Sequence, residues 1–252
     1  MGAITRVFIT FSMALMMIEL QFSHRLQLLV NPKVTPFILI SILVLILLGL
    51  VQIWEMRRTP AHPVSGWGYL FLLLPLLFFL FIPPRSLDST MAAKKEITYA
   101  SAVIPPQATG SVKKKPHDSN PHYNKVLQDL MQQRVITLNP DNYVDRMTTI
   151  QLHAKELVGK TIRVQGFVHY AKEEPNKLIV ARYVVTCCIA DASVVGFPVE
   201  IPRGTAFKEG TWIEVTGTLS TTTIESRRMP QIEGTEVRQI SEPKNAYVYA
   251  NF

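Results

Sequence analysis

Hydrophobic and polar positions divide the chain into an apolar first third and a polar, patterned remainder. Val34 to Trp54 is a run of 21 residues without a charged side chain, and as a helix it would reach about 30 Å, the thickness of a bilayer core. A second uncharged run, Pro63 to Pro84, contains Pro75, which a membrane helix tolerates when neighbouring helices satisfy the freed carbonyl. These runs predict membrane spans at about residues 34–54 and 66–83.

A third apolar segment, Val7 to Phe22, is only 16 residues long and contains Glu19. No small-residue cleavage site follows it, as a secretory signal peptide would require. It therefore predicts a short first span at about residues 5–22, with an interfacial helix as the alternative. Because an ionised carboxylate is costly inside a membrane, Glu19 is a candidate contact to a partner helix or an ion path. The alternative is that Glu19 lies at the interface and reaches water there.

The composition changes after this transmembrane region of residues 1–84. Residues 85–123 are rich in Ser, Thr, Pro, Lys and Ala. Such a segment cannot bury enough apolar area to offset the entropy lost on ordering. We therefore expect a flexible linker of 39 residues here, which tethers a folded C-terminal domain of residues 124–252.

The C-terminal domain begins with helical periodicity and then changes to alternation. Apolar residues repeat at helical spacing in residues 124–134 and 139–157, which predicts one or two helices around a short strand at 135–138. Gly166 interrupts the first of the later strands at a place where a closed sheet must bend. The pattern predicts a mainly-β domain, an OB-like five-stranded Greek-key barrel rather than a sandwich, which usually needs seven or more strands. The five predicted strands lie within residues 161–170, 177–187, 194–201, 211–219 and 231–240.

The distribution of charge narrows the classes of function. The net charge of +7 lies in residues 1–84 and 85–125, whereas residues 126–252 sum to zero. Basic residues beside apolar helices interact with anionic lipid headgroups, so we expect membrane lipid rather than nucleic acid as a partner. No P-loop, Rossmann, G-x-S-x-G or H-E-x-x-H motif occurs, and an enzyme is not expected.

Both cysteines of the chain are adjacent, as Cys187 and Cys188, with Asp191 close behind. Neighbouring side chains of a straight strand point to opposite faces, so joint action requires a bend, which the weak strand propensity of Ala190 and Asp191 allows. Two thiolates and a carboxylate could then bind a divalent metal such as zinc, with His169, His153 or a partner as the fourth ligand. The alternative is that both cysteines pack as small apolar residues and Asp191 caps a turn.

Four segments of the C-terminal domain carry a resemblance to a known family: GKTIRVQGFV, VTCCIADA followed by VGFPVE, GTWIEVTGTL, and PKNAYVY. They resemble the YcgQ-like family of bacterial permease subunits, whose members are membrane-anchored and have a C-terminal domain of uncharacterised function. The motif positions are Cys187, Cys188, Asp191 and Ala192. The resemblance implies a separate multi-spanning permease subunit as the partner.

Together these patterns predict an accessory subunit of a membrane permease. The expected protein is multi-pass in the cell membrane, with a tethered, extracytoplasmic domain that binds substrate, metal or a partner. The alternative is a free-standing metal-binding or thiol-redox protein of the cell envelope.

Overall fold

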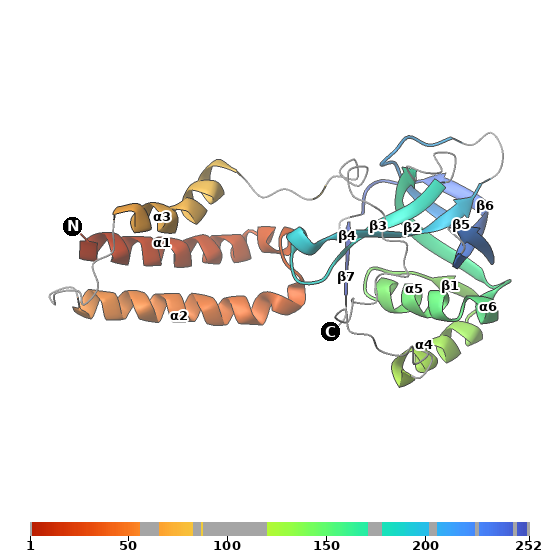
Figure 1. Ribbon diagram of the computed structural model, residues 1–252, viewed down its shortest axis with the longest axis horizontal. Coiled ribbons are helices and arrows are strands. Elements are labelled where there is room, and N and C mark those ends of the chain that lie inside the picture. Colours follow the sequence, from red (N-terminus) through yellow and green to blue (C-terminus); the bar gives the residue numbers. More distant parts are fainter. Residues whose placement is uncertain are drawn as a thin grey trace. The chain divides into compact units, whose positions relative to one another are not determined.

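The computed structural model describes residues 2–55, 66–82, 87, 120–170, 178–201, 206–224, 227–243 and 246–250. Contacts divide the chain into two compact units (Figure 1). The N-terminal unit comprises Met1–Ser86 and the tripeptide Cys187–Ile189. The C-terminal unit comprises Leu87–Thr186 and Ala190–Phe252. Most of the predicted linker, residues 88–119, lies outside the described residues.

The N-terminal unit is built from apolar helices: α1 (Gly2–Phe22), α2 (Thr35–Trp54) and α3 (Gly66–Phe81). Two helical segments, Ile4–Phe22 and Pro32–Trp54, are long and apolar enough to cross a membrane by length and composition. Helix α3 has 16 residues, so it spans about 24 Å, less than the roughly 30 Å of a bilayer core. The predicted third span therefore stays a prediction.

Helices α1 and α2 lie side by side (Figure 1) and pack through a small-residue contact. A Cβ added to Gly49 of α2 would lie 2.7 Å from the Phe11 ring of α1, so only glycine leaves room for that ring. One turn away, the Thr10 hydroxyl donates a hydrogen bond of 3.2 Å to Oε1 of Gln52. Close backbone approach and polar side-chain bonds are the usual means by which membrane helices associate.

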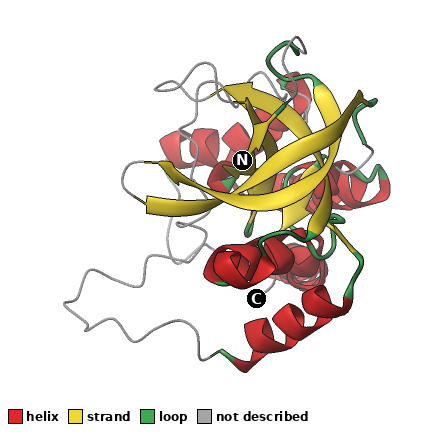
Figure 2. Cartoon of the chain, turned by 90° about the vertical axis from the view of Figure 1, so that its right-hand side faces the viewer, coloured by secondary structure: helices red, strands yellow, loops and turns green. Residues whose placement is uncertain are grey.

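The C-terminal unit contains one seven-stranded sheet in the order β1-β2-β5-β6-β4-β3-β7, with an additional β2–β3 pairing. The strands are β1 (Val135–Thr137), β2 (Thr161–Tyr170), β3 (Leu178–Val185), β4 (Ser193–Glu200), β5 (Trp212–Ile224), β6 (Arg227–Gln239) and β7 (Tyr247–Tyr249). The β2–β3 pairing closes β2, β5, β6, β4 and β3 into a ring. Figure 2 shows these strands curving around one another.

The predicted number of strands is wrong, because the sheet has seven strands instead of five. The five predicted strands are β2 to β6, and the predicted short strand at 135–138 is β1, which pairs in parallel with β2. Strand β7 was missed. It pairs in parallel with β3, and its three residues are too few to give an alternating signal.

Gly166 allows β2 to change partners along one edge. This edge of β2 pairs with β1 over Thr161–Arg163 and with β3 over Phe167–Tyr170, while the opposite edge pairs with β5. A Cβ on Gly166 would lie 2.4 Å from the carbonyl oxygen of Ala181 in β3. This close backbone approach agrees with the prediction that the sheet bends at Gly166.

Helices α4 (Pro121–Gln132), α5 (Tyr143–Leu152) and α6 (Ala154–Leu157) supply apolar residues to the larger core of the ring. Leu130, Met147 and Ile150 are buried there beside Ile162 and Phe197 of the sheet. A smaller core forms on the other side of β3, where alternate residues such as Tyr183 point. Every residue of β3 is therefore buried.

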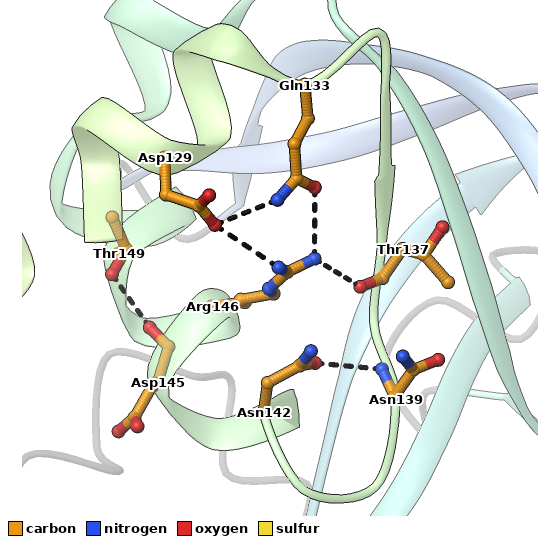
Figure 3. A network of polar contacts seen from close by, with 8 residues as sticks. All are labelled: Asp129, Gln133, Thr137, Asn139, Asn142, Asp145, Arg146 and Thr149. Atoms are coloured by element: carbon orange, nitrogen blue, oxygen red, sulfur yellow. Dashed lines mark hydrogen bonds and ion pairs between the residues drawn. The ribbon is translucent and has the colours of Figure 1, made fainter. Parts of the chain in front are cut away.

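Arg146 of α5 joins α4 to β1 through polar contacts (Figure 3). Its Nη1 donates to the carbonyl oxygen of Thr137 at 2.6 Å and to Oε1 of Gln133 at 3.1 Å. Its Nη2 lies 3.3 Å from Oδ2 of Asp129. Because Gln133 also donates to Asp129 at 2.8 Å, the guanidinium holds the two helices and the strand in one arrangement.

Candidate functional site

The cysteine pair lies in the loop that joins β3 to β4. Strand β3 ends at Val185, and a single 3-10 turn, Ile189–Asp191, precedes β4. The backbone N–H of Thr186 donates to Oδ1 of Asp191 at 2.9 Å, so the carboxylate fixes the loop onto its own beginning. The chain therefore bends where the sequence allowed a bend, and Asp191 contacts the local backbone, although its carboxylate reaches back five residues instead of forward as in an Asx turn.

The bend brings three ligand types together. One ligand atom each from Cys187, Cys188 and Asp191 lie within 4.8 Å of one another, and this is the only such group of His, Cys, Asp or Glu among the described residues. Cys187 and Asp191 are exposed and Cys188 is partly exposed. Neither cysteine is in a disulfide. All three residues belong to one stretch of five residues.

The backbone of Cys187–Ile189 is held by strand-like bonds within the N-terminal unit. Cys188 forms an antiparallel bridge with Val30. On either side of the bridge, Asn31 donates to the carbonyl oxygen of Cys187 at 3.0 Å, and Ile189 donates to the carbonyl oxygen of Leu29 at 2.7 Å. These bonds engage backbone atoms of the loop and fix its path.

Of the three alternatives for a fourth ligand, His169 and His153 are not part of this group, and a ligand from a partner stays a prediction. His169 pairs with Ile179 in the sheet, six residues or about 20 Å along β3 from the strand end at Val185. Its Nδ1 contacts Oε1 of Glu209 at 2.5 Å. His153 is buried and its Nδ1 contacts Oε1 of Glu156 at 2.9 Å. Each histidine therefore has a carboxylate partner of its own.

Comparison with known proteins connects this architecture to a family. Residues 5–98 match the DUF1980 N-terminal domain, and residues 113–250 match the DUF1980 C-terminal domain. The chain belongs to the DUF1980 family.

Two named proteins are similar to this DUF1980 chain. The UPF0703 protein YcgQ of Bacillus subtilis (strain 168) is 28% identical over 195 residues, covering 73% of this chain and 68% of YcgQ. A protein of Streptococcus mutans serotype c (strain ATCC 700610 / UA159), named "Putative two-component membrane permease complex subunit", is 26% identical over 262 residues, covering 92% of this chain and 94% of that one. No solved structure matches the chain. The expected membership of the YcgQ-like permease subunit family is confirmed.

A buried polar cluster around Arg182 of β3, with Tyr143 of α5 and Trp212 of β5, was not expected from the sequence. Arg182 is only 2% exposed, and its guanidinium carbon lies 5.1 Å from the centre of the Trp212 ring. Burial lowers the pKa of Arg182, and burial raises the pKa of Tyr143 against the opposing effect of the Arg182 charge. The hydroxyl of Tyr143 and Nε1 of Trp212 have no hydrogen-bond partner among the described residues. The available signal was a single arginine within the otherwise apolar run LIVARYVV.

Glu19, the other predicted site residue, is exposed on α1 three residues before the end of that helix. Its side chain is not part of the cysteine group. A contact between Glu19 and a partner helix stays a prediction.

Proposed function

We propose that this chain is the accessory subunit of a two-component membrane permease. The observation that carries the proposal is the relative from Streptococcus mutans, whose printed name describes a subunit of a membrane permease complex. The alignment covers 92% of this chain and 94% of that protein. Both the helical unit and the strand-rich unit are therefore shared, and a role that depends on either can be common to the two proteins.

In this proposal the N-terminal helices anchor the subunit and contact a separate multi-spanning permease. Helices α1 and α2 supply two spans by length and composition, and α3 supplies the third. Most large apolar side chains of these helices are exposed, including Phe8, Leu47 and Phe71, which suits contact with lipid tails or with partner helices. Glu19 is the polar group most suited to a specific intramembrane contact, because an ionisable residue within a span normally has a functional partner.

The C-terminal domain then acts as a tethered, extracytoplasmic binding domain. Its closed ring β2-β5-β6-β4-β3, with a parallel β4–β6 pairing, supports an OB-like Greek-key barrel. We propose a binding role without catalysis, since the sequence carries no P-loop, Rossmann, G-x-S-x-G or H-E-x-x-H motif. The zero net charge of residues 126–252 disfavours single-stranded nucleic acid, which OB domains bind through a basic groove.

Co-purification tests the proposal. The tagged chain, extracted from its native membrane in mild detergent after brief cross-linking, should bring down one multi-spanning protein in a fixed ratio. Glu19→Gln should reduce that yield, because the amide removes the charge while keeping the size of the side chain. Glu55→Gln, at the C-terminal end of α2, is the matched control and should not reduce it. Recovery of the chain alone with and without the cross-linker would refute the proposal.

One observation favours a second candidate, a free-standing metal-binding or thiol-redox protein of the envelope. The two thiol groups are close together and at least partly exposed, an arrangement that suits direct thiol chemistry. Under this candidate the same purification yields a lone membrane protein that retains a metal or cycles between thiol and disulfide.

A further inference from the structure

Two cysteines and one aspartate converge at the tip of the β3–β4 loop without a fourth protein ligand in their group. We propose that Cys187, Cys188 and Asp191 form an open, three-ligand site for Zn²⁺ from which the ion can exchange. For the biological use of the ion, this site rests on the proposed function. It names Zn²⁺ as the ligand that the C-terminal domain binds.

The geometry of the loop is close to what zinc requires. Ligand atoms that bind one tetrahedral zinc ion at about 2.0–2.3 Å are separated from one another by roughly 3.3–3.8 Å. The three ligand atoms here already lie within 4.8 Å of one another. Side-chain rotation of Cys187, which is exposed, and of Cys188, which is partly exposed, would close a remaining gap of about 1 Å.

The ligand set selects among metals. Two thiolates favour thiophilic ions such as Zn²⁺ and Cu⁺, whereas Mg²⁺ and Ca²⁺ prefer oxygen ligands. The carboxylate of Asp191 distinguishes the first two, because a hard oxygen ligand suits Zn²⁺ and adds little for Cu⁺. The three charges sum to −3 when both thiols are deprotonated, so a divalent ion leaves a net charge of −1 at a solvent-accessible position.

The proposed site has an open coordination position, which allows the ion to exchange. Structural zinc sites in proteins have four protein ligands and exclude solvent, whereas three-ligand sites keep a position for water or another molecule. The exposure of Cys187 and Asp191 lets a water molecule, or a ligand from a partner, complete the coordination. Such a site can accept an ion and release it again, as a binding domain beside a permease requires.

Asp191 has a second task that the experiment must separate from metal binding. Its Oδ1 accepts the hydrogen bond from Thr186, so removal of the side chain would loosen the loop whether or not a metal binds. Asp191→Asn keeps an oxygen for that bond and removes the charge, whereas Asp191→Ala removes both. The difference between the parent and Asp191→Asn therefore reports the charge, and the difference between the two variants reports the oxygen that accepts the hydrogen bond from Thr186.

The test uses the whole chain, purified in mild detergent and reduced, with Co²⁺ as a coloured probe and Zn²⁺ as its competitor. We expect one Co²⁺ per chain, with a sulfur-to-cobalt charge-transfer band that Zn²⁺ abolishes. Cys187→Ser and Cys188→Ser should each lower Zn²⁺ affinity at least about 10-fold and weaken the band, because even indirect supporting residues of metal sites typically matter by 10-fold or more. Asp191→Asn should lower the affinity with unchanged circular dichroism, and Asp191→Ala should lower it further.

Asp141→Asn is the matched control, because Asp141 is also an exposed aspartate in a turn of the C-terminal domain, and it should bind Zn²⁺ like the parent. Co²⁺ binding without the sulfur band, or affinity unchanged in Cys188→Ser or in Asp191→Asn, would overturn the proposal. The co-purification experiment tests the permease role separately from the metal site. Metal binding by a chain that has no partner refutes the permease role and keeps the site, whereas a stable complex without thiol-dependent metal refutes only the site.

Discussion

Closure of the strand ring at Gly166 leads to a quantitative prediction for Gly166→Ala. The new Cβ would lie 2.4 Å from the carbonyl oxygen of Ala181 and 2.8 Å from Cγ1 of Val180. Relief requires β2 and β3 to separate by more than about half an ångström, because the nearest atom belongs to the backbone and not to a flexible side chain. Overpacking of this kind costs about 1–3 kcal/mol, and a weakened buried backbone hydrogen bond adds about 1 kcal/mol.

Alanine also reduces the entropy of the unfolded chain, which offsets this loss of stability by about 0.4–1 kcal/mol. We therefore expect the free energy of unfolding to fall by about 2 kcal/mol, within a range of about 1–3.6 kcal/mol. Gly234→Ala is the matched control, because it is also a strand glycine but its new Cβ would have no neighbour closer than 3.2 Å. Its expected change is below about 1 kcal/mol. With a typical urea m-value of about 2 kcal/mol/M, the two midpoints should differ by about 1 M.

The assay follows tryptophan fluorescence during urea unfolding of a fragment that begins at Leu87. Trp212 is the only tryptophan in that fragment, and it is buried against Phe167, the residue after Gly166, at a ring-centroid distance of 5.7 Å. Equal midpoints for Gly166→Ala and the parent, or equal losses in the two variants, would refute the close approach of β2 to β3.

Three further predictions concern the domain, its pH response and its location. A fragment of residues 120–252 should be a soluble monomer with circular dichroism dominated by β structure, and recovery only as aggregates would contradict the division into units. The Gln165 hydrogen bond, followed by the contacts with Arg238, holds the pKa of Glu214 below its usual range. A depressed pKa stabilises the fold above the unfolded value of about 4.3, and this stability is lost as pH falls through the folded pKa. The stability difference between the parent and Glu214→Gln should therefore shrink as the pH falls from 6 to 3, and a constant difference would exclude this linkage. Protease added to intact cells should remove the C-terminal domain if three spans place it outside, whereas complete protection would indicate two spans and a cytoplasmic domain.

Local patterns predicted the elements of this fold well because they depend on neighbouring residues. Alternation located β2 to β6, and weak strand propensity at Ala190 and Asp191 allowed the bend that brings the cysteine pair and Asp191 together. The carboxylate contact with Thr186 also involves a short stretch of chain. These features needed no knowledge of the rest of the molecule.

Long-range pairing explains what the sequence did not reveal. His169 was a reasonable ligand by residue type, but its position is set by the register of β2 against β3, which periodicity does not encode. Strand β7 exists because Tyr247–Tyr249 pairs with a strand more than 60 residues earlier. Arg182 lies in a strand with both faces buried, so alternation could not show that its charge points into the protein.

The ring also determines the order in which the domain can fold. Strands β5 and β6 form a hairpin, and hairpins form within about 1–10 μs. Closure instead requires Val199 to meet Ile232, and Thr161 to meet Thr218 across 57 positions. Such non-local contacts slow folding to milliseconds or seconds. Until closure, β2 and β4 have open edges that can pair with another chain, so crowding of unfolded copies at the membrane would favour strand exchange between them.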